Sequence, residues 1–155
     1  MCIRNWLCDI LNCNCNSGNG INIPPPSPLD DSNSTEVLTI LKAEFPNAQM
    51  FISDSDYKTT TKKELERYLK EDITDSYKYV SEYFDCDDFS FCLMGQLSNP
   101  DWGCLAFGIV WTKVPGGAHA VNCFISNSGT VYLVEPQSDK IFKCPDNWEP
   151  FLIMM

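Results

Sequence analysis

The sequence predicts an α+β fold in which helices come first and an antiparallel sheet follows. Two observations support this. Between residues 34 and 97, apolar residues recur at helical spacing behind residues that favour helix N-termini. After Pro100 the pattern changes to apolar, strand-like runs separated by the turn signal Asn127-Ser128-Gly129. Helices followed by strands in this order indicate N-terminal helices packed on a C-terminal antiparallel sheet.

Three helices are expected in the first part of this unit. Ser34 can cap a helix over about residues 35–45, which ends before a proline. Thr61 and Glu64 have the spacing of a capping box, and apolar residues behind them predict a second helix. The third helix is expected to begin at Cys86, because an apolar stripe follows it at helical spacing. The members of that stripe are Phe89, Cys92, Leu93 and Leu97.

Strands are expected in the second part. Residues 104–111 form a continuous apolar run, which is typical of a buried strand. Residues 118–125 and 131–135 flank the turn signal and are expected to pair as a hairpin. Residues 141–143 are expected to add a short strand.

The chain of 155 residues has the length of one domain with a short N-terminal region. Residues 1–33 read as a short amphipathic helix followed by a linker rich in Pro, Asn and Gly, and residues 34–155 as the domain. The amphipathic stretch at residues 2–11 is expected to dock on a partner surface, and its acylation is the weaker alternative. The cysteines around it are spaced as in no usual zinc module; they are Cys2, Cys8, Cys13 and Cys15.

Composition excludes several classes of function. Twenty-one acidic residues against eleven basic ones give a net charge of −10, which argues against a nucleic-acid-binding protein. No apolar run is long enough for a transmembrane segment. A single histidine excludes a multi-histidine metal site. Nine cysteines without a clear signal peptide predict free thiols in a reducing compartment, the cytoplasm, including the host cytoplasm of a phage.

Three residues form a candidate catalytic set. Cys86 lies at a predicted helix N-terminus, where the helix dipole favours a thiolate. His119 and Glu135 each lie eight residues from Asn127 at the hairpin turn, so they are expected to face each other across the two strands. A carboxylate beside a histidine fixes its tautomer and supports the imidazolium. Taken singly, each residue fits a structural role; taken together, they predict a Cys-His-Glu triad.

The acidic residues around Cys86 oppose this role. Asp85, Asp87 and Asp88 are expected to raise the thiol pKa. A bound Ca²⁺ would neutralise them, and Asp87 and Asp88 are its candidate ligands. The alternative is that these side chains are solvated charges at a helix N-terminus, where they stabilise the helix.

Residues 83–89, 118–122 and 131–137 together resemble a known family. They are similar to the papain-like cysteine-protease domain at the C-terminus of a mushroom chimerolectin agglutinin, of which stand-alone versions occur in bacteria and phages. The resemblance covers roughly residues 36–143. It implies a papain-like α+β fold, calcium-dependent proteolysis and catalytic roles for Cys86, His119 and Glu135. Val80 stands where many papain-like enzymes keep a Gln oxyanion donor, so Gln137 or the Cys86 N–H is the candidate donor instead.

The sequence therefore predicts a cysteine-peptidase-like hydrolase acting on a peptide or protein substrate. Cys86 would attack the carbonyl, and His119 would take the thiol proton. Amidase or transglutaminase-like chemistry fits the same residues. The rival hypothesis is a small acidic, non-enzymatic inhibitor that binds a basic, nucleic-acid-binding host protein.

Overall fold

The structure is a computed structural model that describes residues 23–155. The predicted helix at residues 2–11 and the four cysteines around it lie outside this range. Residues 23–33, predicted to be linker, lie against the domain: Ile23 is buried in the core, and Asp30–Asn33 form strand β1. No helix of the described part of the chain is long and apolar enough to cross a membrane.

The α-helices between residues 23 and 155 begin where polar side chains satisfy their first N–H groups. The Asn33 side chain accepts from two N–H groups of the first turn of α2, and Thr61 Oγ1 accepts from the Glu64 N–H in α3. The Asp85 N–H donates to Asp88 Oδ2 at the start of α4. The elements are α2 (Ser34–Glu44), α3 (Lys62–Leu69), the 3₁₀-helix η1 (Thr74–Ser76) and α4 (Cys86–Leu97).

The strands form a six-stranded mixed sheet, in the order β2-β8-β4-β5-β6-β7, and a separate pair, β1-β3. Strands β4 to β7 are antiparallel meander neighbours, whereas β2 pairs in parallel with β8 at one edge. The bounds are β1 (Asp30–Asn33), β2 (Gln49–Phe51), β3 (Asp56–Thr59), β4 (Phe107–Val114), β5 (Gly117–Ile125), β6 (Val131–Glu135), β7 (Lys140–Phe142) and β8 (Glu149–Met154).

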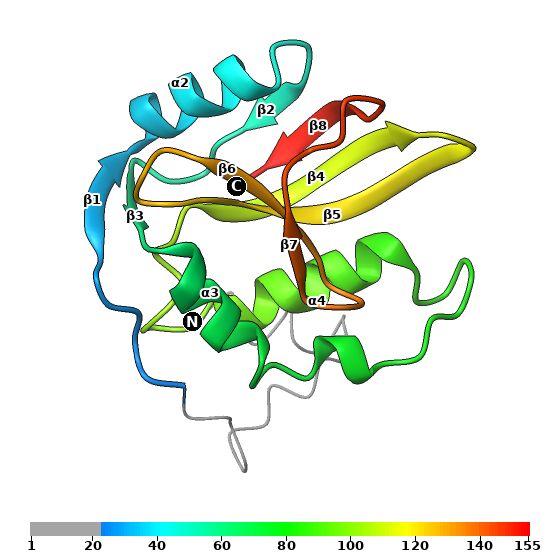
Figure 1. The fold of residues 1–155 in the computed structure, drawn as a ribbon, viewed down its shortest axis with the longest axis horizontal. Helices are drawn as coiled ribbons and strands as arrows, with labels where there is room; N and C mark the ends of the chain where they lie inside the picture. Colours follow the sequence, from blue (N-terminus) through cyan, green and yellow to red (C-terminus); the bar gives the residue numbers. More distant parts are fainter. Residues whose placement is uncertain (1–22) are drawn as a thin grey trace, which may run out of the picture.

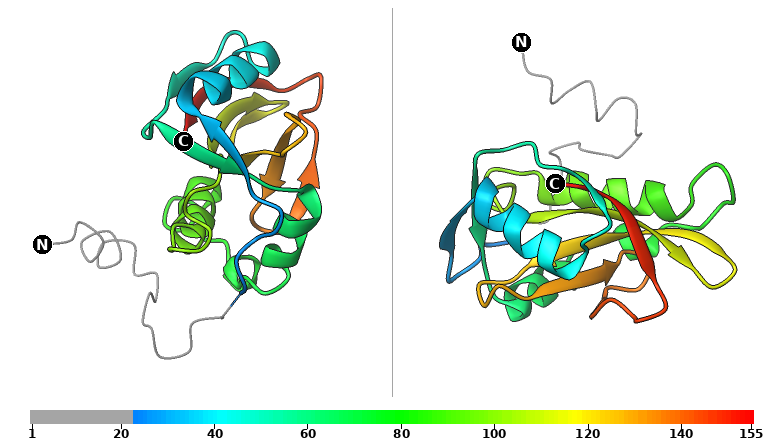
Figure 2. Two further views of the ribbon diagram at one scale, coloured as in Figure 1. Left: turned by 90° about the vertical axis from the view of Figure 1, so that its left-hand side faces the viewer. Right: turned by 90° about the horizontal axis from the view of Figure 1, so that it is seen from above.

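Helices cover both faces of the large sheet, as Figures 1 and 2 show. On one face, Val37 and Leu41 of α2 pack into a core with alternating residues of the central strands, such as Val121 of β5. On the other face, Leu65 of α3 and Leu93 of α4 pack into a second core. Because side chains of a strand alternate between faces, the apolar central strands supply both cores.

The predicted arrangement is therefore wrong. The individual helices and the hairpin begin close to where the sequence places them, but the whole is not a papain-like α+β layout of N-terminal helices on a C-terminal antiparallel sheet. Strand β2, from the N-terminal half, joins the sheet as a parallel edge strand, and the described residues hold eight strands against three α-helices. The sequence did not predict the strands at residues 30–33, 49–51 and 56–59, because each is only three or four residues long and shows no clear alternation.

A buried amide ties α4 to the sheet. Asn122 of β5 is fully buried, and its Nδ2 donates to the backbone oxygens of Ser90 in α4 and Gly108 in β4, at 2.9 and 3.2 Å. Gly108 itself sits so close to β8 that a Cβ there would lie 2.2 Å from the Met154 carbonyl oxygen. The start of α4, with Cys86, is thus held at a fixed place over β5.

Candidate functional site

The structure brings His119 and Glu135 together. His119 Nε2 lies 2.8 Å from Glu135 Oε2, and both side chains are about one-fifth exposed. Glu135 Oε1 accepts from the backbone N–H and the side-chain amide of Gln137, each at 3.4 Å. Gln137, a candidate oxyanion donor by sequence, therefore orients the Glu135 carboxylate instead.

The register of the hairpin differs from the expected one. Asn122 pairs with Val134 and Ile125 with Val131, so the centre of the turn is Ser128 rather than Asn127. His119 and Glu135 are consequently diagonal neighbours and do not lie directly opposite. A shift of two positions between partners keeps both side chains on one face of the sheet, and for this reason they still meet.

Cys86 lies at the first residue of α4, half-buried and close to the strand that carries His119. Burial and then the charges of Asp85 and Asp87 raise the pKa of its thiol, although a hydrogen bond from the Ala120 N–H opposes this. No hydrogen bond joins Cys86 to His119 among the described residues. Burial and the neighbouring charges thus oppose the thiolate that the helix dipole favours.

The acidic residues around Cys86 have distinct roles. Asp88 is engaged as the partner of the Asp85 N–H in the helix cap. Asp85 and Asp87 share a hydrogen bond, which lowers the pKa of Asp85 and raises that of Asp87. Ligand atoms of Asp85, Cys86 and Asp87 lie within 4.8 Å of one another. Two neighbouring carboxylates suit a hard divalent cation, but the thiol between them is not a calcium ligand. The calcium site at Asp87 and Asp88 stays a prediction.

Trp148, in the segment between β7 and β8, borders the histidine on its other side. Its ring meets the His119 ring edge-to-face, with centroids 5.8 Å apart, and meets Phe142 in the same way at 5.7 Å. Trp148 is half-buried, so it shields the His119 ring while part of its own surface stays accessible.

A groove opens beside Trp148. Its volume is about 450 Å³, and it runs between the segment after α2 and the segment that leads into β8. Its lining combines aromatic rings with amide, carboxylate and ammonium groups: Glu44, Phe45, Pro46, Asn47, Lys113, Cys144, Pro145, Asp146, Trp148, Glu149, Pro150 and Phe151.

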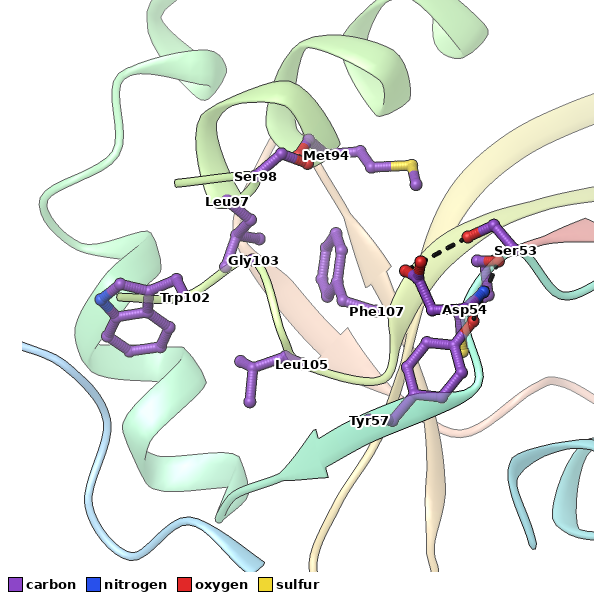
Figure 3. A pocket seen from close by; sticks show the side chains of 11 residues that line it. Ser53, Asp54, Tyr57, Met94, Leu97, Ser98, Trp102, Gly103, Leu105 and Phe107 are labelled. Atoms are coloured by element: carbon purple, nitrogen blue, oxygen red, sulfur yellow. Dashed lines mark hydrogen bonds between the residues drawn. The ribbon is translucent and has the colours of Figure 1, made fainter. Parts of the chain in front are cut away.

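A second, smaller pocket lies at the other end of α4 (Figure 3). It has a volume of about 190 Å³, and its walls include Met94, Leu97, Leu105 and Phe107. These residues begin eight positions after Cys86, more than two helical turns along α4. This pocket is thus separate from the His119–Glu135 pair. Its lining also includes Asp54 and Tyr57, and the Asp54 N–H donates to the Tyr57 hydroxyl oxygen at 3.1 Å.

The solved structures of similar fold include two mushroom-lectin chains. One is PSL1a in complex with E64, with 24% identity, a TM-score of 0.71, and a match that covers 81% of this chain and 51% of the other. The second is the Polyporus squamosus lectin bound to the human-type influenza-binding epitope Neu5Aca2-6Galb1-4GlcNAc, with 23% identity, a TM-score of 0.68 and coverage of 81% and 49%. No protein-family model and no curated protein matches the chain.

These likenesses show the fold. The described chain has the fold of part of a mushroom lectin, and it spans about half the length of the lectin chains that it matches. The resemblance to a mushroom lectin is thus shown at the level of fold, whereas a papain-like protease domain is not supported.

The comparisons also correct the predicted function. Both neighbours are lectins, one in complex with E64 and one in complex with a glycan, and neither is named as a peptidase. The prediction of a cysteine-peptidase-like hydrolase with a peptide or protein substrate is therefore wrong. The rival hypothesis of a non-enzymatic binding protein fits better. Its partner, however, differs from the basic host protein that the sequence predicted.

Sequence reasoning missed Trp148, Asn122 and the groove. Trp148 lies in an irregular segment, where no periodicity marks it, and it contacts His119 only through the fold. Asn122 interrupts an apolar strand, and a polar residue at a position expected to be buried is the signal that could have identified it.

Proposed function

We propose that this chain is a non-enzymatic glycan-binding protein and that the groove beside Trp148 holds the glycan. The observation that carries the proposal is the lining of that groove, which brings Trp148 and Phe151 together with the Asn47 amide. Small-molecule sites typically combine aromatic walls with a few polar groups that fix orientation. The lectin neighbours, one of them bound to a trisaccharide epitope, support a sugar as the ligand.

The groove suits a sugar in both size and chemistry. Its volume of about 450 Å³ falls within the range of about 300–1,000 Å³ of ligand pockets. The apolar face of a pyranose ring can pack on Trp148 or on Phe151, which is 41% exposed. Hydroxyl groups of the sugar can donate to the carboxylates of Asp146 and Glu149 and accept from the Asn47 amide.

Charge favours a neutral glycan over a sialylated one. Three carboxylates line the groove against the single ammonium of Lys113, and Lys113 already pairs with Glu149 at 3.5 Å. The whole chain carries −10. A carboxylate on the sugar would therefore meet net negative charge, so Galβ1-4GlcNAc is expected to bind at least as well as its sialylated form.

The residues predicted as a catalytic site do not line the groove, and His119 is linked to it through Trp148. His119, held by its hydrogen bond to Glu135, contacts the Trp148 ring edge-to-face, and Cys86 is the first residue of α4. A calcium ion at Asp87, together with Asp85 or Asp88, is the second part of the proposal; it would bind near Cys86 and would not be required by the groove. The cytoplasmic location stays our expectation.

Calorimetric titration with Galβ1-4GlcNAc and with Neu5Acα2-6Galβ1-4GlcNAc tests the proposal. We expect saturable binding that falls at least about tenfold, or about 1.4 kcal/mol, in Trp148→Ala. Because Trp148 also packs on His119 and Phe142, Phe151→Ala and Asn47→Ala provide variants with less effect on the fold. Tyr83→Ala is the matched control, since Tyr83 is 86% exposed and does not line the groove.

Two outcomes would contradict the proposal. One is the absence of glycan binding, or binding that all groove variants retain. The other is thiol chemistry: E64, which the first neighbour binds, should leave the mass of this protein unchanged. A covalent E64 adduct at Cys86 that is lost in Cys86→Ser would show a reactive thiol, and a non-enzymatic role would then be untenable.

A further inference from the structure

The described chain starts at a fixed point beside the pocket of Figure 3. Ile23, the first described residue, is buried in the second core, and its backbone oxygen accepts from Trp102 Nε1 at 3.4 Å. Arg67 lies over the Trp102 ring and donates through Nη2 to the backbone oxygens of Pro24 and Pro25, at 3.0 and 3.4 Å. Trp102 also lines the pocket. The chain that precedes Ile23 therefore joins the domain next to this pocket.

The pocket is an opening in that same core. Most of its apolar lining belongs to the core that Ile23 joins or packs against that core: Met94, Leu97, Trp102, Leu105 and Phe107. Its volume of about 190 Å³ exceeds the water-sized gaps that cores usually leave, yet it is below the range of about 300–1,000 Å³ of small-molecule sites. The pocket therefore suits one large apolar side chain better than a small-molecule ligand.

The sequence before Ile23 supplies apolar side chains of the matching kind. Within residues 2–11, apolar residues recur at helical spacing: Ile3, Trp6, Leu7, Ile10 and Leu11. Packing such a stripe against the domain removes apolar surface from water, which is favourable. Trp6 is the largest of these side chains, and Trp is enriched among the residues that anchor interfaces.

The length of the intervening chain keeps this stretch near the pocket. Eleven residues, 12–22, separate residues 2–11 from Ile23. Even when it is fully extended, a chain of that length spans no more than about 40 Å. A short tether gives the two sites an effective concentration on the order of millimolar. Docking on this pocket therefore needs less intrinsic affinity than docking on a separate molecule.

Charge also favours this docking. Arg4 is the only basic residue before Ile23, and helical spacing would place it beside Leu7 at the edge of the apolar stripe. Asp54 lines the pocket on the side away from Trp102 in Figure 3, and none of the ion pairs formed by residues 23–155 involves it. An ion pair between the Arg4 guanidinium and the Asp54 carboxylate would fix the direction in which the segment lies.

We propose that residues 2–11 of this chain pack on the pocket at the C-terminal end of α4, with Trp6 as the side chain that enters it and Arg4 paired with Asp54. The surface on which residues 2–11 are expected to dock is then a surface of the same chain. This pocket shares no lining residue with the groove beside Trp148, so the inference is independent of the proposed glycan site.

Amide shifts of the full ¹⁵N-labelled chain test the docking. Trp6→Ala should move the signals of Gly103 and of the Trp102 indole N–H and leave those of the Trp148 groove in place. Asn14→Ala is the matched control, because it changes the preceding chain without removing an apolar side chain, and it should move none of these signals. Unmoved pocket signals in Trp6→Ala would overturn the proposal. Pocket shifts that grow with protein concentration would also overturn it, because a second copy would then supply the segment.

Exchange of charge tests the direction of the segment. Arg4→Glu should move the pocket signals toward their positions in Trp6→Ala, and Asp54→Arg in the same chain should return them to those of the unmodified protein. If Asp54→Arg restores nothing, the ion pair and the proposed direction are overturned.

Thermal melting of double variants locates the contact. Met94→Ala also weakens the core by itself, so its coupling with Trp6→Ala is the informative quantity. The two single losses of melting temperature should sum to more than the loss in the double variant, because both changes remove the same contact. Trp6→Ala combined with Tyr83→Ala should be additive, since Tyr83 is 86% exposed and does not line the pocket. Additive losses for Trp6→Ala and Met94→Ala would overturn the proposed contact.

Discussion

The two sides of His119 differ in chemistry. On the α4 side lies Cys86, a half-buried thiol whose pKa is raised by burial and by Asp85 and Asp87. On the other side lies Trp148, which meets the His119 ring and lines a groove of about 450 Å³. The first side has residue types that suggest catalysis but an environment that suppresses the thiolate. The second side has the aromatic and polar composition of a binding site.

The identity of a residue and its environment carry separate information about its role. A cysteine at a helix N-terminus is activated only if the helix dipole exceeds the desolvation and the neighbouring charges. Here burial and the charges of Asp85 and Asp87 raise the pKa of the Cys86 thiol, against the effect of the helix dipole. The groove, in contrast, needs no ionisation for binding, since its walls act by shape and by hydrogen bonding.

The largest expected effect is a loss of folding stability on the α4 side of His119 that leaves the groove unchanged. Asn122→Ala removes the amide that bonds the Ser90 and Gly108 oxygens and leaves both without this partner. The free energy of unfolding should fall by about 1–3 kcal/mol. Urea denaturation measures this loss. Because Asn122 anchors α4 and not the groove, the affinity for Galβ1-4GlcNAc should be unchanged below the unfolding transition; a parallel loss of affinity would show that the two sides are coupled.

Removing negative charge from the groove should change which of the two glycans it prefers. Replacing Asp146 by Asn and Glu149 by Gln together should improve binding of the sialylated trisaccharide by about tenfold relative to Galβ1-4GlcNAc, because two carboxylates leave a site that retains Lys113. Competitive titration at low salt measures the ratio. Asp101→Asn combined with Glu71→Gln provides a control of equal net charge outside the groove lining. An equal change in this control would show that net charge and not the groove sets the preference.

The raised pKa of the Cys86 thiol can be lowered in part by removing neighbouring charges. Asp85→Asn with Asp87→Asn removes two of the charges that raise the thiol pKa, so iodoacetamide should label Cys86 several-fold faster at neutral pH. Peptide mapping by mass spectrometry gives the rate at each site. Cys144 is the internal reference, because its pKa is raised by burial and by Glu44 and Asp146, which stay in place. An unchanged Cys86 rate would mean that access alone limits its reactivity.

The smallest effect is a dependence of stability on pH. Asp139 has a folded-state pKa of about 6, above its ordinary value, so the folded state binds this proton more tightly than the unfolded state. The free energy of unfolding should therefore gain a contribution as pH falls from 7 through 6, complete only near the ordinary pKa of about 4. Denaturation at pH 7 and pH 5 should show this gain in the unmodified protein and a smaller gain in Asp139→Asn. Equal gains in both would remove Asp139 as its source.

Local signals in the sequence predicted the elements that depend on local chemistry. The start of α4 at Cys86 and the cap of α3 at Thr61 follow from side chains that satisfy backbone N–H groups within one turn. The meeting of His119 with Glu135 follows from the hairpin, despite a turn centred one residue later than expected. These features require no knowledge of the rest of the chain.

Long-range arrangements were beyond local signals. The parallel pairing of β2 with β8 joins residues about one hundred positions apart, and β2 has only three residues, too few for a period of two to stand out. The contact of Trp148 with His119 likewise exists only once β8 has joined β4. The pKa of Cys86 depends on burial, which the helix pattern could not quantify.

Mapping of amide chemical shifts tests the central claim most directly. Galβ1-4GlcNAc is titrated into uniformly ¹⁵N-labelled protein. If the groove holds the glycan, saturable shifts should be concentrated there, at Asn47, Trp148 and Phe151, with little change at Cys86 and Asp87. Shifts that gather around Cys86 instead, or no shifts at millimolar glycan, would contradict the assignment of the groove as a glycan site.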